Sequence, residues 1–327
     1  MPDGSGRRGE PAKRDDLRKG EGRSLAQGRE EPAPVEDNLA GHIPGRLEAY
    51  HSHAHEKHDT IKSMKPKVER LASSIAGAIS SWDAVECIAL AEHSESDVLD
   101  PNFALVVDAY LRADPPRAEE RQAAYALTLG QPGAFETSTS RSKDRFFIEG
   151  LPVRAEYKSV AVIDEVLARC KDPDSQAVWI LKNSGTYMFY RLQRSRVLFQ
   201  KTSWIDTVRK DLGELPEAFW ALLREADLSK MEHYLSDLGA ATLSDDGYFY
   251  DVSLAGYIRY AAAAVFVANR RFEPSHRHVT MRLRELKRLP GDFLGRWETL
   301  LRPDIDISRS QKYEVAELLA KSVLAIA

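Results

Sequence analysis

The chain contains little cysteine and no long hydrophobic run. Cys87 and Cys170 are the two cysteines among 327 residues, and they lie far apart in apolar surroundings. A disulfide framework is therefore not indicated, and we expect two buried, reduced thiols. There is no run of 18 apolar residues and no signal-peptide core. We accordingly expect a cytoplasmic protein without a membrane partner.

The chain also lacks an excess of charge of one sign. Its 46 Lys and Arg residues are balanced by 50 Asp and Glu residues, for a formal net charge of -4. Binding to nucleic acid needs a basic surface, and no basic stretch dominates, so a nucleic-acid partner is not expected. With 43% hydrophobic residues, the chain can bury a sizeable core, and its length corresponds to about two domains.

Aromatic residues are missing from the first 46 positions, which hold equal numbers of basic and acidic residues. Such a segment buries too little apolar area to offset the entropy cost of ordering it. We therefore predict a disordered tail over residues 1–46, a folded domain over residues 47–171 and a second domain over residues 172–327.

Three histidines follow the tail at helical spacing. His51, His55 and His58 occupy positions i, i+4 and i+7, which places three imidazoles on one helical face at a spacing able to bind a transition metal. They lack the carboxylate or cysteine pattern of a known site type, so a solvated helical face is the competing interpretation. A further helix is predicted over residues 68–82.

Two apolar segments after this helix predict neighbouring strands. The first covers residues 85–91 and ends in a polar turn that contains Ser94. The second lies within residues 99–110, where side chains should alternate between the two faces of a sheet. Phe103, Leu105, Val107 and Ala109 fall on one face, and Ala104, Val106 and Asp108 fall on the other.

A second strand with a carboxylate is predicted farther along the chain. Residues 117–129 indicate a helix, and residues 133–147 indicate a polar loop that contains Lys143 and Arg145. Two strand pieces around a Gly-Leu-Pro turn follow. Alternation in the second piece sets Arg154 and Glu156 on the face opposite Val153, Ala155 and Tyr157.

Asp108 and Glu156 each interrupt an otherwise apolar strand. A carboxylate that loses water needs a cation or hydrogen-bond donors, and two close carboxylates raise each other's pKa. A divalent metal would meet both requirements, and Mg²⁺ sites are built from such oxygen ligands. The alternative is ion pairing with Arg112, Arg154 or Lys158, and the spacing leaves both interpretations open.

The order of these elements resembles the nucleotidyltransferase fold of the DNA polymerase beta superfamily. The shared order is a helix, a strand ending in a serine-containing turn, an acidic strand, a helix and a later strand with one more carboxylate. More narrowly, residues 100–110, 143–158 and 265–279 look like a bacterial nucleotidyltransferase-like family with a domain described as DUF4037. The likeness covers about residues 82–158 and, more weakly, the helices that follow.

The resemblance implies an enzyme that moves a nucleoside monophosphate from a nucleoside triphosphate to a hydroxyl of a small molecule or protein, with Mg²⁺ assisting in-line attack. Three carboxylates would then be catalytic: Asp100, Asp108 and Glu156. The same three and Asp97 would hold the metal. Lys143 and Arg145 lie in the polar loop, where cations would meet the triphosphate. The alternative is that they are ordinary surface charges of that loop.

The phosphate-binding turn of the superfamily matches this chain in part. Ser94 corresponds to its serine, whereas His93 stands where that turn has glycine. Asn102 and Ala104 stand where the superfamily has an Asp-x-Asp pair. The resemblance therefore leaves an alternative to the enzyme, which is a catalytically degenerate nucleotide-binding or protein-interaction module.

From residue 172 onward apolar residues recur at helical spacing. Helices are predicted over residues 176–183, 186–199, 204–212, 217–224, 229–238, 252–271, 279–289 and 310–326. A basic cluster over residues 269–278 either complements a helix C-terminus or faces Asp108 and Glu156 across a cleft. The predicted fold class is α+β, a small mixed-sheet nucleotidyltransferase-like domain followed by an all-helical domain.

Overall fold

The computed structural model describes residues 66–94, 97, 100, 103–130, 132–172, 181, 185–303 and 306–327. The predicted tail and the histidines His51, His55 and His58 lie outside these residues, as does the predicted helix over residues 176–183 apart from residue 181. The described residues belong to one compact unit.

A mixed six-stranded sheet forms the first part of the fold, in the order β3-β4-β5-β2-β1-β6. The strands are β1 (Val85–Leu90), β2 (Leu105–Leu111), β3 (Gly133–Thr137), β4 (Lys143–Ile148), β5 (Leu151–Ser159) and β6 (Arg196–Gln200). β2 and β5 are parallel, and the other neighbours are antiparallel. The α+β class with a mixed sheet is thereby confirmed.

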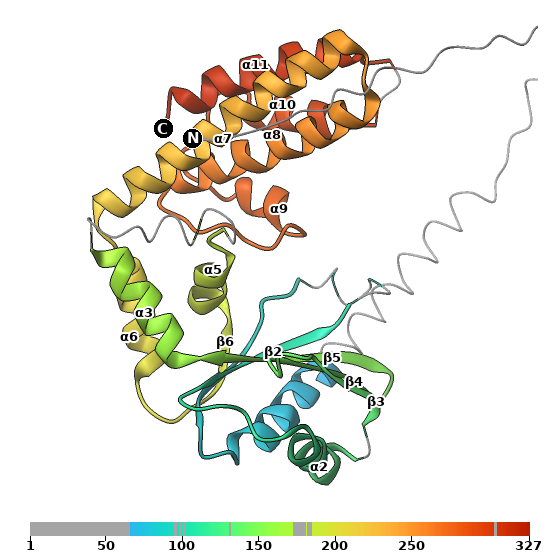
Figure 1. Ribbon diagram of the computed structural model, residues 1–327, viewed down its shortest axis with the longest axis vertical. Coiled ribbons are helices and arrows are strands. Elements are labelled where there is room, and N and C mark those ends of the chain that lie inside the picture. Colours follow the sequence, from blue (N-terminus) through green and yellow to red (C-terminus); the bar gives the residue numbers. More distant parts are fainter. Residues whose placement is uncertain are drawn as a thin grey trace, which may run out of the picture. The chain divides into compact units, whose positions relative to one another are not determined.

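Two helices cover one face of the sheet (Figure 1). Residues 66–80 form the first, and α2 (Ala118–Leu129) is the second. The first helix buries Leu71, Ile75 and Ile79 against Leu105 and Val107 of β2, because positions i, i+4 and i+8 share one face of a helix. The predicted helix and the predicted inward face of β2 are therefore confirmed.

Three further helices pack on the opposite face. They are α3 (Val160–Lys171), α5 (Tyr187–Arg194) and α6 (Trp204–Gly213). Their apolar side chains form a second core with Cys87, Ala89 and Tyr110 of the sheet. Cys87 and Cys170 are free and buried in this core, as predicted. Burial raises the pKa of both thiols to about 12.

The second part of the described chain is a helical bundle. It consists of α7 (Glu217–Ser244), α8 (Gly247–Ala268), α10 (Phe293–Leu301) and α11 (Arg309–Leu324), with the short α9 (Val279–Leu283) beside it. Gly256 lets α8 approach α7 closely, because a Cβ at that position would collide with the Tyr234 ring. Figure 1 shows α7 and α8 running side by side.

One described helix, α8, is long and apolar enough to cross a membrane by length and composition alone. Of its most apolar stretch, 56% is buried inside the protein, as expected for the central helix of a bundle. This is weak evidence for a membrane span, and the absence of a membrane partner stays a prediction.

Several predicted boundaries are wrong. Residues 133–137 form β3 and residues 143–147 form most of β4, so the predicted loop shrinks to the turn over residues 138–142. β4 forms because Asp144, Phe146 and Ile148 alternate into the core. The predicted helix over residues 186–199 stops at Arg194, and the chain then pairs with β1 as edge strand β6. This strand lies beyond the predicted domain boundary at residue 171. The helices predicted over residues 217–224 and 229–238 are one helix, α7.

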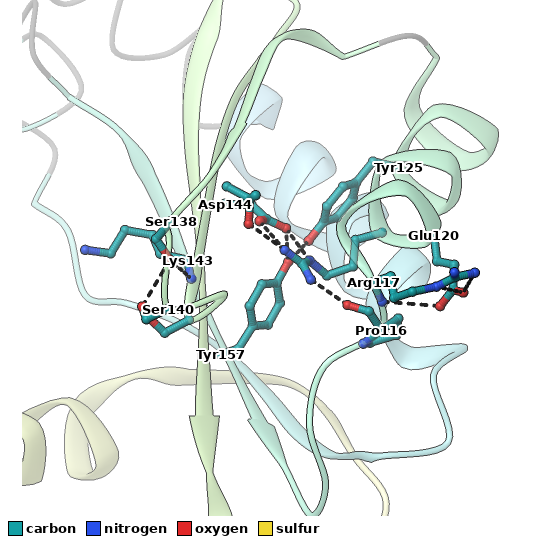
Figure 2. Close-up of polar contacts among 12 residues, drawn as sticks. Pro116, Arg117, Glu120, Tyr125, Ser138, Ser140, Lys143, Asp144 and Tyr157 are labelled. Carbon is teal, nitrogen blue, oxygen red and sulfur yellow. Dashed lines mark hydrogen bonds and ion pairs between the residues drawn. The ribbon is translucent and has the colours of Figure 1, made fainter.

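A buried ion pair joins α2 to the sheet. Arg121 and Asp144 are both 0% exposed, and Arg121 Nε and Nη2 each donate to one Asp144 oxygen at 2.8 Å. The Tyr157 hydroxyl donates to Asp144 at 2.6 Å and lies 2.7 Å from the Tyr125 hydroxyl. Figure 2 shows Asp144, Tyr125 and Tyr157 converging on this point. The network fixes α2 over β4 and β5.

We expect Arg121→Met to lower the free energy of unfolding by about 3–5 kcal/mol, because it strands the Asp144 charge in the core. The double substitution Arg121→Met with Asp144→Leu should recover most of that loss, since no unpaired charge remains. Urea denaturation measures both. A single variant within about 1 kcal/mol of the wild type would contradict a tightly enclosed pair.

Candidate functional site

Asp108 and Glu156 lie side by side in the sheet. They are direct partners in the parallel register of β2 and β5. Both side chains point away from residues 66–80 and α2, because their strand neighbours Val107 and Ala155 fill the core on that side. The alternation predicted along each strand is therefore confirmed, and the structure shows that the two carboxylates lie on the same face of the sheet. Asp108 is fully buried, so its charge must be balanced within the protein.

Three cations balance the two carboxylates. Arg191 Nη2 donates to Asp108 Oδ1 at 2.5 Å, and its Nη1 donates to Glu156 Oε2 at 2.8 Å. Lys158 Nζ lies 2.9 Å from Asp108 Oδ1 and 3.6 Å from Glu156 Oε2. Arg154 Nε lies 2.9 Å from Glu156 Oε1. The ion-pairing alternative holds for Arg154 and Lys158, whereas Arg112 pairs with Glu86 at 2.5 Å.

These neighbours shift the pKa values of the group. Burial alone would raise the pKa of Glu156, but the charges of Arg191, Lys158 and Arg154 outweigh it and lower that pKa below its usual value. Burial alone would lower the pKa of Arg191, but Asp108 and Glu156 outweigh it and raise that pKa. Both groups are therefore charged at neutral pH.

Arg191 is held in place by its own helix. Its guanidinium carbon lies 5.7 Å from the centroid of the Tyr187 ring, one helical turn earlier. The start of α5 is tied down by Thr186, whose Oγ1 accepts the Glu273 N–H at 2.8 Å. The Thr186 N–H in turn donates to Glu273 Oε2 at 3.4 Å. A side chain fixed in this way contacts both carboxylates at little further cost in entropy.

The predicted phosphate-binding turn contacts the basic cluster of residues 269–278. The Ser94 N–H donates to Asp97 Oδ2 at 2.6 Å, and His278 Nε2 lies 2.8 Å from the same oxygen. Burial would raise the pKa of Asp97, but the hydrogen bonds from Ser94 and His278 outweigh it and lower that pKa. Arg277 pairs with Asp100. The cluster therefore contacts Asp97 and Asp100 instead of Asp108 and Glu156.

A pocket of about 170 Å³ lies between this turn and the sheet. Its walls come from the sheet face, the turn, the start of α5 and the basic cluster: Ala91, Glu92, His93, Asp97, Phe103, Ala104, Val106, Arg154, Tyr187, Ser275, Arg277 and His278. Arg282 pairs with Glu92. Arg154 and Arg277 bring guanidinium groups to the pocket walls, and each of them also pairs with a carboxylate, Glu156 and Asp100 respectively.

Lys143 and Arg145 lie on β4 and not in a loop, which corrects their predicted setting. Lys143 is the register partner of Glu156, and Arg145 is the partner of Arg154. Directly opposed residues of an antiparallel pair point to the same face. The structure therefore brings both cations to the sheet face that carries the two carboxylates, although neither lines the pocket.

The residues present do not fit a divalent metal in this arrangement. The oxygens of Asp108 and Glu156 that would ligate it are bonded to Arg191 and Lys158. Asp97 and Asp100 are paired with the basic cluster. Within the described residues no group of three or more His, Cys, Asp or Glu side chains is placed to hold a metal ion. The predicted Mg²⁺ site stays a prediction.

Arg191 is the site residue that the sequence analysis missed. It lies inside a helical run, 83 positions from Asp108 and 35 from Glu156, and the sequence pattern gives no contact across such distances. One signal was present. Arg191 lies one turn after Tyr187 and next to Tyr190 in an amphipathic helix. An unpaired cation would be unfavourable on the apolar side of such a helix.

Comparison with known proteins adds little to this geometry. No protein-family model matches the chain, and no curated protein matches it. Among solved structures it is similar to a nucleotidyltransferase-like protein from Exiguobacterium sibiricum 255-15, at 12% identity and a TM-score of 0.42, over 76% of this chain and 72% of that one. A likeness this distant assigns no role to any residue here, and the narrower resemblance to the DUF4037-type family stays a prediction.

We expect Glu156→Gln to destabilise the protein by about 1–3 kcal/mol at pH 7, because one charged hydrogen bond to Arg191 is lost. The folded-state pKa of Glu156 is lowered, so its stabilising contribution is complete above the unfolded-state pKa of about 4.3 and disappears as the pH falls through the folded-state value. The difference between variant and wild type should therefore shrink below pH 4. Urea denaturation at pH 7, 5 and 3 measures it, and a constant difference would contradict the ionised pair.

Proposed function

We propose that this protein binds a phosphorylated small molecule, in the first instance a nucleoside triphosphate, in the pocket beside Asp108 and Glu156. It does so as a catalytically degenerate member of the nucleotidyltransferase-like proteins that its sequence resembles. The observation that carries the proposal is the combination of a pocket lined by Arg154 and Arg277 with a carboxylate pair already neutralised by Arg191 and Lys158.

The pocket walls suit the parts of a nucleotide. Arg154 and Arg277 supply guanidinium groups, which recognise phosphate oxygens through paired hydrogen bonds. Tyr187 and Phe103 offer aromatic surface on which a base can stack. The volume of about 170 Å³ is below the usual range of roughly 300–1,000 Å³ for whole ligands, so it accommodates part of a nucleotide and leaves the rest outside.

A second candidate function is the Mg²⁺-dependent nucleotidyl transfer implied by the resemblance. It is favoured by one observation, the register pairing of Asp108 with Glu156, since carboxylates on adjacent strands are the arrangement such enzymes need. In that case Asp100, Asp108 and Glu156 act on the triphosphate, and the acceptor is a hydroxyl of a small molecule or protein. Arg191 and Lys158 would first have to leave the two carboxylates.

A melting screen with ATP, GTP, CTP and UTP, each with EDTA or with Mg²⁺, separates the two functions. We expect at least one triphosphate to raise the melting temperature in EDTA, because a ligand that binds the folded state stabilises it.

Arg277→Ala should weaken binding about tenfold to a hundredfold in calorimetry, since it removes a charged hydrogen-bond donor.

The matched control is Arg271→Ala. This arginine belongs to the same basic cluster but is exposed and does not line the pocket, so its loss should leave the affinity unchanged. Stabilisation that requires Mg²⁺, together with transfer of label from an α-labelled triphosphate, would favour the enzyme. No response to any of the four triphosphates would refute both functions.

A further inference from the structure

The guanidinium of Arg191 contacts two carboxylates that lie side by side on neighbouring strands. Two different nitrogens of Arg191 bond to two different residues, Asp108 at 2.5 Å and Glu156 at 2.8 Å. Lys158 approaches the same two oxygens at 2.9 and 3.6 Å. A bridging contact to oxygens of both carboxylates is the position that a divalent cation would take in a site of this kind.

The positive charge of the two side chains equals that of a divalent ion. Arg191 and Lys158 each contribute one positive charge, so together they supply the two charges of a divalent metal ion. Arg154 contributes one more and would remain beside Glu156 in either case. The net charge of the group is therefore the same whether the two side chains or one divalent ion stands between the carboxylates.

Both side chains are enclosed and held by neighbours. The side chain of Arg191 is 8% exposed and that of Lys158 is 21% exposed. Arg191 lies beside the Tyr187 ring, and Lys158 Nζ lies 5.9 Å from the centroid of the Tyr110 ring. The sheet and α5 therefore hold both cations in place. Charged side chains on a protein surface, in contrast, are mobile and form weak ion pairs.

We propose that Arg191 and Lys158 take the place of a divalent cation between Asp108 and Glu156. The chain thus carries a pair of carboxylates of the kind that binds a metal ion, and its own side chains supply the balancing positive charge. Removing the two cations then leaves a site that a free divalent ion can fill. The inference concerns the carboxylate pair alone and needs no nucleotide, so it stands or fails separately from the proposed function.

The competing explanation is an ordinary buried ion pair, and the chain supplies an example for comparison. Arg121 and Asp144 form a fully buried, bidentate pair, in which a single carboxylate contacts the guanidinium. One carboxylate with tyrosine hydroxyls around it is a poor divalent site. Loss of Arg121 should therefore create no affinity for metal, whereas loss of Arg191 and Lys158 should.

The test is the double variant Arg191→Ala with Lys158→Ala, titrated with Mn²⁺ alone. Electron paramagnetic resonance counts bound Mn²⁺, and the melting temperature is followed with Mn²⁺ and with Mg²⁺. We expect one more bound Mn²⁺ per chain than in the wild type and a saturable rise of several degrees in melting temperature. Adding Asp108→Asn to the double variant should abolish both effects, and Arg121→Ala should show neither.

The test still decides the proposal if the double variant folds poorly. If the variant is unfolded without metal, Mn²⁺ should restore its fold, because the ion replaces the missing counter-charge. A variant that stays unfolded in Mn²⁺, or that folds and binds no more Mn²⁺ than the wild type, would overturn the proposal. Equal rescue of Arg121→Ala would also overturn it, since the response would then be unspecific.

Discussion

The contact of Arg191 with Asp108 and Glu156 is the interaction on which the candidate site depends. Two carboxylates lie next to each other on β2 and β5, and one of them is fully buried. Such a pair is strongly unfavourable unless positive charge reaches it. α5 packs on that face of the sheet through the apolar side chains of Phe189, Tyr190 and Leu192, and this packing brings Arg191 to both carboxylates. Lys158 of β5 supplies a second cation.

The same principle of local charge balance shapes the pocket. Glu92, Asp97 and Asp100 on the chain after β1 are paired with Arg282, His278 and Arg277 from the segment that follows α8. These contacts join residues that are 177 to 190 positions apart in the sequence. Arg154, which also lines the pocket, is balanced in the same way by Glu156.

Alternation along single strands made part of this site predictable. The pattern around Asp108 and Glu156 put both carboxylates on the correct face, because successive side chains of a strand point to opposite sides. The edge strands β3 and β6 were missed, since each is five residues long and polar at several positions. Their pairing depends on a neighbouring strand, which a local pattern does not contain.

Hydrophobic periodicity over a few residues predicted the helix near residues 66–80 and the strand face on which each carboxylate lies. The apolar neighbours of the two cysteines predicted their burial, and the order of the elements together with the family resemblance predicted the class of fold. The side chains that pair with the carboxylates, in contrast, depend on tertiary contacts. Arg191 is 83 residues from Asp108, and no periodicity links positions that far apart. The packing of α5 on the sheet therefore sets which helical cation pairs with the two carboxylates.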